Sequence, residues 1–168
     1  AARSAAGLGV ALLTVHGIGG EAMVRAAVAG AGATTGILVV TVLTSMDLSM
    51  LRAAVGREVA SVGDEVARLA GIAAQAGAHG VVCSGHECAS VVAAHPGLGV
   101  LVPGIRASGG ATHDQSRVVT PEQALAAGAR YAVIGRAVTA AADPAAAYRV
   151  FDRALRAGVT DVLRDAAR

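Results

Sequence analysis

The sequence predicts an α/β fold, a partial (β/α)8 barrel with about five βα units and parallel strands. Short apolar runs alternate along the chain with alanine-rich amphipathic stretches, which is the pattern of repeated βα units. The runs are almost entirely apolar, as in parallel strands that are buried on both faces. The chain has 168 residues, whereas a complete barrel takes about 250. Residues 1–168 are therefore expected to form a single domain that is an incomplete TIM barrel.

The individual elements follow from the same pattern. Strands are expected in the β-branched apolar runs Val10–His16, Gly36–Leu43, Gly80–Cys83, Leu98–Pro103 and Tyr131–Ile134. Helices are expected in the amphipathic stretches near Glu21–Ala31, Arg57–Ala76, Glu87–Ala94, Pro121–Ala127 and Pro144–Ala167. Thr120 before Pro121 reads as an N-cap followed by a proline in the first helical position. Strands alternating with helices in this way imply right-handed crossovers between parallel neighbours.

A doubly wound dinucleotide-binding sheet is the competing architecture. Such a sheet carries G-x-G-x-x-G after its first strand, and the glycine-rich segment Val15–Gly20 lacks that spacing. A Walker-type phosphate loop requires a lysine, and the chain contains none. The barrel is therefore the preferred architecture.

The composition argues against several classes of function. The net charge of +2 does not favour a nucleic-acid partner. No run approaches the roughly 18 uninterrupted apolar residues that a membrane helix needs. The start, Ala1–Ser4, lacks the layout of a signal peptide, so a soluble, cytoplasmic protein is expected. The absence of lysine excludes Schiff-base chemistry by these residues.

Cys83 and Cys88 are the only cysteines, with His86 between them. Two cysteines are too few for a disulfide framework. A zinc site takes about four ligands, and the sequence holds no second cluster. A cysteine at a strand end and a cysteine on a helix are the simpler interpretation, so no metal is expected.

The segment from Gly104 to Thr120 carries the strongest functional signal. A long polar, glycine-rich loop between two elements is usually functional or disordered, and barrel phosphate sites lie in the loops after the last two strands. Gly135 after the last strand lets a ligand approach the backbone closely. Arg136 offers a planar fork that fits phosphate oxygens. Arg106 and Gln115 are expected to add a second guanidinium and an amide donor.

Polar residues in and after this loop also have simpler interpretations. Arg136 could be a surface arginine that follows a strand. Arg117 is interpreted as an ion-pair partner that anchors the loop, with Asp114 as a candidate partner. His113 is interpreted as a solvated loop residue.

Several motifs in fixed order carry a resemblance to a known family. They are Leu13-Thr14-Val15-His16-Gly17, Val40-Thr41-Val42-Leu43-Thr44-Ser45-Met46, Gly104-Ile105-Arg106, Asp114-Gln115-x-Arg117 with Thr120-Pro121, Val133-Ile134-Gly135-Arg136, and Ala142-Asp143-Pro144. Together they resemble bacterial orotidine 5′-phosphate decarboxylase over essentially the whole chain. The first two match that family's fourth and fifth strands, so the chain corresponds to strands four to eight.

The resemblance implies a (β/α)8 barrel, a homodimer with shared active sites, and no cofactor. The reaction would be the decarboxylation of orotidine 5′-phosphate to uridine 5′-phosphate in pyrimidine biosynthesis. By motif position, Arg106, Gln115, Gly135 and Arg136 would contact the substrate, chiefly its phosphate. Thr44 would lie beside the pyrimidine ring, although a threonine capping the turn after its strand is the alternative.

His16 ends a strand, and its place in the family pattern implies structural support rather than catalysis. The family's decarboxylation machinery is an alternating array of lysines and aspartates from the first three strands, with one aspartate supplied by the partner subunit. This chain has no lysine and starts just before the counterpart of strand four. No catalytic residue is therefore assigned here, and the isolated chain is expected to be inactive.

Three hypotheses follow from the sequence. The first is that the chain is an incomplete copy of a decarboxylase. The second is another phosphate-binding barrel enzyme of the same superfamily, such as a sugar-phosphate decarboxylase or an epimerase. The third hypothesis is a non-catalytic module that binds a nucleotide or phosphate. Such a module would need a cover for the exposed strand edges at Val10–His16 and Tyr131–Ile134.

Overall fold

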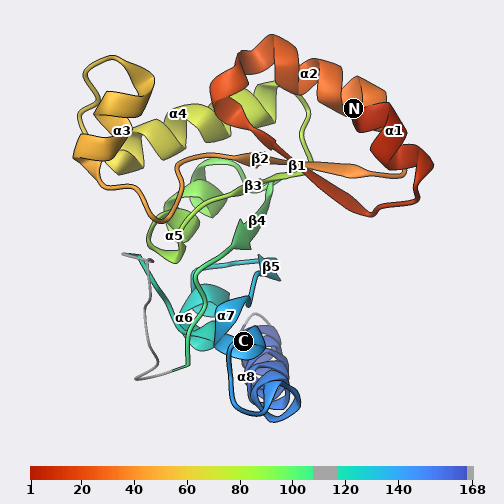
Figure 1. The fold of residues 1–168 in the computed structure, drawn as a ribbon, viewed down its shortest axis with the longest axis vertical. Coiled ribbons are helices and arrows are strands. Elements are labelled where there is room, and N and C mark those ends of the chain that lie inside the picture. Colours follow the sequence, from red (N-terminus) through yellow and green to blue (C-terminus); the bar gives the residue numbers. More distant parts are fainter. Residues whose placement is uncertain (108–116, 166–168) are drawn as a thin grey trace.

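A computed structural model of the chain describes residues 1–107 and 117–165, with only the backbone described from 158 onward. One sheet of five parallel strands forms its centre, in the order β1-β2-β3-β4-β5. The strands are β1 (Leu12–His16), β2 (Gly36–Val40), β3 (Gly80–Val82), β4 (Gly99–Val102) and β5 (Tyr131–Ala132). Figure 1 shows them following one another in chain order. This arrangement confirms the predicted partial barrel of about five βα units.

The strands are shorter than predicted, mostly at their carboxyl ends. β2 ends at Val40, before the expected Leu43, and β5 ends at Ala132, before Ile134. Leu43 and Val133 are 44% and 45% exposed and line cavities beyond the strand ends. An apolar side chain at the mouth of the sheet continues the hydrophobic pattern of the strand without joining its hydrogen-bond ladder, so the pattern overestimated strand length.

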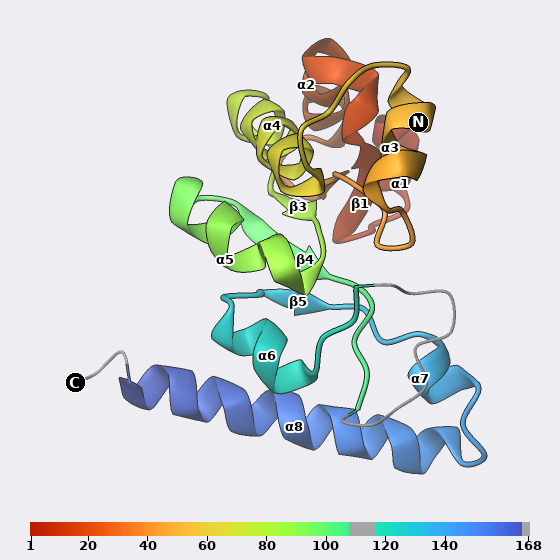
Figure 2. The same ribbon diagram turned by 90° about the vertical axis from the view of Figure 1, so that its left-hand side faces the viewer.

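Five helices lie close to their predicted positions. They are α2 (Gly20–Ala31), α4 (Val62–Gln75), α5 (Gly85–Ala94), α6 (Pro121–Ala126) and α8 (Pro144–Asp165). α2, α4 and α5 contact the sheet, and Figure 2 shows α4, α5 and α6 along one side of it. At the start of α6, Thr120 and Gln123 form the reciprocal capping box, with Pro121 in the first turn. The predicted start of α6 is therefore confirmed.

Four short elements were not predicted: α1 (Ala2–Gly7), the 3-10 turn η1 (Gly17–Gly19), α3 (Leu48–Val55) and α7 (Arg136–Thr139). The caps of α3 are visible in the sequence, because the side chain of Asp47 accepts from the Met50 amide and Gly56 closes the helix in the left-handed conformation. Ser61 caps α4 in the same way. The expected helix from Arg57 therefore starts later, at Val62, because residues 57–61 connect two capped helices.

The core is formed by aliphatic residues of the strands and of the helices that pack on them. It includes Val24, Ile37, Val39, Val66, Val81, Val100 and Val102, none more than 2% exposed. Near the amino end of the sheet, Gly80 lies against Gly99, and a Cβ on Gly80 would overlap with the Gly99 carbonyl. Glycine at this position therefore allows β3 and β4 to approach. Within the described residues, no helix combines the length and the apolar character needed to span a membrane.

Candidate functional site

A cavity of about 170 Å³ lies at the carboxyl ends of β4 and β5. It is lined by Thr44, Pro103, Gly104, Arg106, Val133, Gly135 and Arg136. Four of the five residues expected to bind substrate thus converge from three separate strand ends. The fifth, Gln115, lies outside the described residues. Because parallel strands place their carboxyl ends at one edge, residues far apart in the sequence meet there.

Arg106 forms the deepest charged part of this cavity. Arg106 is only 7% exposed, and its Nη1 donates to the Ile105 carbonyl at 2.8 Å. Its backbone amide donates to the Val119 carbonyl at 3.0 Å, and Ile105 and Val119 form an isolated parallel bridge. The two chain segments that flank residues 107–117 are therefore held together beside the cavity.

The Val119 side of this bridge packs closely against α5. A Cβ on Gly85, the first residue of α5, would lie 2.6 Å from methyl carbons of Val119. Val119 therefore fits against α5 because position 85 has no side chain. The position of Arg106 thus depends on a contact with the helix that follows β3.

Gly135 and Arg136 form a second, more open wall of the cavity. Gly135 precedes α7, and a Cβ placed on it would meet no atom within 4 Å. Arg136 is the first residue of α7 and is exposed. An open backbone next to an exposed guanidinium is suited to an anionic ligand that approaches from solvent.

Thr44 contributes the third wall, in the segment after β2. Thr44 is 8% exposed. Among the described residues that line the cavity, two are arginines and none carries a carboxylate. The electrostatic environment therefore favours an anion, and two guanidiniums can together donate to several phosphate oxygens.

Arg117 is not among the described residues that line this cavity. Its Nη1 pairs with Glu87 Oε1 of α5 at 2.7 Å, and both side chains are 13% exposed. Its Nη2 donates to the Leu43 carbonyl at 3.1 Å. The expected ion-pair role is thus observed, but with Glu87, because α5 places that carboxylate beside Arg117; Asp114 lies outside the described residues.

The two cysteines occupy the positions that the simpler interpretation gave them. Cys83 directly follows β3 and Cys88 lies on α5, and both are buried and unbridged. Burial raises the pKa of both thiols, that of Cys88 to about 11. His86 is exposed. Among the described residues, no group of three or more His, Cys, Asp or Glu side chains could hold a metal ion.

His16 lies at the end of β1 and borders a different cavity. That cavity measures about 120 Å³ and is mainly apolar, with Leu43, Met46 and Leu51 among its lining residues. The cavity at Arg136 does not include His16. His16 is therefore separate from the cavity that holds Arg106 and Arg136, and its supporting role stays a prediction.

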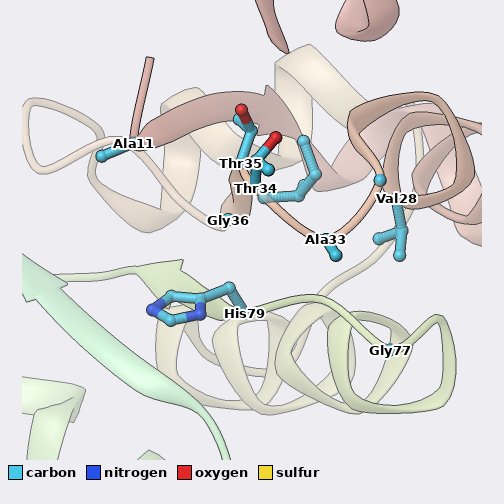
Figure 3. Close-up of a pocket in the computed structure, with 10 residues that line it drawn as sticks. Ala11, Val28, Ala33, Thr34, Thr35, Gly36, Gly77 and His79 are labelled. Carbon is cyan, nitrogen blue, oxygen red and sulfur yellow. The ribbon is translucent and has the colours of Figure 1, made fainter. Parts of the chain in front are cut away.

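A larger cavity of about 350 Å³ lies at the amino-terminal end of β2. Figure 3 shows His79 facing the segment that carries Thr34 and Thr35 across it. Among the described residues that line this cavity, none is an arginine. This lining therefore offers no guanidinium to a phosphorylated ligand.

The chain resembles known proteins along most of its length. Residues 1–151 match the family described as "Orotidine 5'-phosphate decarboxylase / HUMPS family". The orotidine 5′-phosphate decarboxylase of Anaeromyxobacter dehalogenans is 54% identical over 152 residues, which cover 89% of this chain and 65% of that protein. The enzyme of the same name from Thermobifida fusca is 53% identical, covering 88% and 62%. The chain thus spans less than two thirds of the length of these relatives.

Solved structures give the same picture of the fold. The crystal structure of orotidine 5′-phosphate decarboxylase from Lactobacillus acidophilus superposes with a TM-score of 0.75 at 32% identity, over 92% of this chain and 67% of that one. An uncharacterized conserved protein from Geobacillus kaustophilus superposes with a TM-score of 0.73 at 31% identity. The open sheet described above therefore corresponds to part of a larger barrel.

Proposed function

Because the chain belongs to the orotidine 5′-phosphate decarboxylase / HUMPS family, we propose that it forms the phosphate-binding part of an orotidine 5′-phosphate decarboxylase. The reaction converts orotidine 5′-phosphate to uridine 5′-phosphate and carbon dioxide. The observation that carries this proposal is the cavity in which Thr44, Arg106, Gly135 and Arg136 converge, with two arginines and no acidic side chain among its described lining residues.

Different residues hold different parts of the proposed nucleotide ligand. Arg136 and Arg106 bind the phosphate from two sides, and the open backbone at Gly135 lets its oxygens approach. Gln115 adds an amide donor, as the family motif implies. Thr44, on the neighbouring wall, faces the pyrimidine side of the ligand. Binding energy gained at a remote phosphate lowers the barrier at the reacting carbon if it is used to orient and desolvate the substrate.

The proton that replaces the carboxylate has to come from elsewhere. The family resemblance assigns that step to a lysine, and the 168 residues contain none. We therefore propose that residues outside this sequence supply the lysine and aspartate array. By the same resemblance, the complete enzyme is proposed to be a cytoplasmic homodimer without a cofactor.

A non-catalytic module that binds nucleotides is the second candidate. The absence of lysine supports it, because the phosphate cavity is present without the expected proton donor. The two candidates predict the same ligand preference and differ in turnover. Decarboxylation restored by adding the first three βα units of a relative, such as the Anaeromyxobacter dehalogenans protein, would favour the enzyme.

Ligand binding tests the phosphate assignment itself. Isothermal titration of the chain with uridine 5′-phosphate and with uridine is expected to show a clear preference for the phosphorylated ligand. Replacement Arg136→Ala should weaken uridine 5′-phosphate roughly 100-fold, because two charge-assisted hydrogen bonds are lost. Uridine binding should change little.

Arg130→Ala is the matched control for that replacement. Arg130 precedes β5 whereas Arg136 follows it, and its guanidinium carbon lies 5.7 Å from the centre of the Tyr131 ring. This control should leave the preference for the phosphorylated ligand intact. Equal losses for uridine and uridine 5′-phosphate in Arg136→Ala would contradict the assignment.

A further inference from the structure

A partly buried ion pair and a hydrogen bond made by the same arginine link segments beside the candidate phosphate cavity. Arg117 pairs with Glu87 at 2.7 Å through Nη1 and donates to the Leu43 carbonyl at 3.1 Å through Nη2. The three groups come from separate parts of the chain, since Arg117 is 30 residues from Glu87 and 74 from Leu43. A single guanidinium therefore fixes α5 to the segment after β2.

The segments that Arg117 joins are those that carry the site. Leu43 immediately precedes Thr44, which lines the cavity. Arg117 lies two residues before Val119, whose carbonyl accepts from the backbone amide of Arg106 at 3.0 Å. One end of this connection thus holds the Thr44 wall, and the other holds the Arg106 wall.

Arg117 is held by protein groups beside the cavity. It is not among the described residues that line the cavity, and its charge is balanced by Glu87, which is 13% exposed, as Arg117 is. An arginine can donate in two fixed directions at once, which a lysine cannot reproduce because its ammonium is a single point on a flexible stem. The arrangement therefore uses the shape of the guanidinium as well as its charge.

We propose that Arg117 is a positioning residue that sets the separation between the Arg106 wall and the Thr44 wall of the cavity. This inference rests on the proposed function, because it treats the two walls as the phosphate side and the pyrimidine side of one nucleotide site. A ligand that spans both walls depends on their separation. Inorganic phosphate contacts the arginines but does not reach the Thr44 wall, so its affinity does not depend on that separation.

The test compares three ligands on the full chain: uridine 5′-phosphate, inorganic phosphate and uridine. In Arg117→Lys, the affinity for uridine 5′-phosphate is expected to fall roughly 10- to 100-fold, which corresponds to about 1.4 to 2.7 kcal/mol. The affinity for inorganic phosphate should stay within about twofold, because the backbone bond between Arg106 and Val119 remains. The readout is the ratio of the two dissociation constants.

Two further variants keep the test decisive. Glu87→Gln preserves the shape of the side chain and removes its charge, so it should change the same ratio in the same direction even if a variant at 117 does not fold. Arg25→Lys is the matched control, because Arg25 pairs with Glu21 on the exposed surface of α2, away from the cavity. That control should leave the ratio unchanged.

The outcomes separate this inference from the proposed function. An unsubstituted chain that binds uridine 5′-phosphate no better than uridine would overturn the proposed function. A different outcome is that the preference is present while the affinities for uridine 5′-phosphate and inorganic phosphate fall equally, or do not fall, in Arg117→Lys and Glu87→Gln. In that case the positioning role is wrong and the ion pair only stabilises the fold.

Discussion

The two ends of the sheet differ in what their cavities contain. The cavity at the amino-terminal end measures about 350 Å³ and is lined mostly by small or apolar residues, together with His79 (Figure 3). The cavity at the carboxyl end measures about 170 Å³ and contains two arginines. The smaller cavity is therefore the better candidate site, because converging charge identifies a site for a phosphorylated ligand and volume does not.

Glycine also has opposite uses at the two ends. At Gly80, a side chain would collide with the Gly99 carbonyl, so glycine allows two strands to pack. At Gly135, a side chain would enter empty space beside Arg136, so glycine leaves room for a ligand. If this distinction holds, substitutions at the amino end should change stability alone, and those at the carboxyl end should change binding.

The largest effect is expected from Gly80→Ala. The added methyl group must displace backbone of β4, and overpacking of this kind costs about 3 kcal/mol of unfolding free energy. Chemical denaturation followed by circular dichroism measures the loss. Under conditions where the variant is folded, its affinity for uridine 5′-phosphate should equal that of the original chain. A large binding defect in the folded variant would break the division between the two ends.

Glu65→Gln should lower the unfolding free energy by about 2 kcal/mol at neutral pH, because hydrogen bonds to charged partners are lost. Glu65 lies on α4, is 3% exposed, and pairs with Arg57 at 2.6 Å and with Arg68 at 2.7 Å. Its hydrogen bond to Arg68 holds the pKa of its carboxyl below the ordinary value of 4.5, against the effect of burial. Denaturation at neutral pH measures the difference.

The pH dependence of stability gives a second readout for Glu65. A carboxyl whose pKa is lowered by folding stabilises the protein above its unfolded pKa, and this contribution is lost as pH falls through the folded pKa. Stability should therefore decline below about pH 4.5 less steeply in Glu65→Gln than in the original chain. Glu58, whose side chain is 90% exposed beside Arg52, provides the control Glu58→Gln. Parallel pH profiles for Glu65→Gln and the original chain would refute the assigned role.

Gly135→Ala should weaken uridine 5′-phosphate about tenfold, which corresponds to about 1.4 kcal/mol. The methyl group occupies space that the phosphate is proposed to enter, while it meets no protein atom within 4 Å. The unfolding free energy should change less than in Gly80→Ala. Titration calorimetry and denaturation on the same sample test both statements, and unchanged affinity would count against a ligand at this wall.

Tyr131→Phe should have the smallest effect, a loss of about 0.5 kcal/mol. The Tyr131 hydroxyl lies 2.9 Å from His79 Nε2, and His79 is exposed, so water can replace the bond. Thermal unfolding measures this difference. Nucleotide affinity should be unaffected, because His79 lines the amino-terminal cavity rather than the one at Arg136.

The sequence alone determined the number and order of the strands and most of the candidate site. Each buried parallel strand appears as an apolar run of its own, and the residues that follow such runs gather at one edge of the sheet. For that reason, Arg106, Gly135 and Arg136 could be assigned to one site before their contacts were known. The family motifs added Thr44 and the expected ligand.

Only the tertiary structure decided which groups hold that site in place. Arg117 pairs with the carboxylate of Glu87, 30 residues away in the sequence, and donates to the carbonyl of Leu43, 74 residues away. Asp114, the local candidate partner, lies outside the described residues. A hydrophobic pattern specifies which face of an element is buried, but not which polar groups meet where separate elements cross. Those partners depend on how α5 and the segments after β2 and before α6 pack together, and that packing is a property of the assembled sheet.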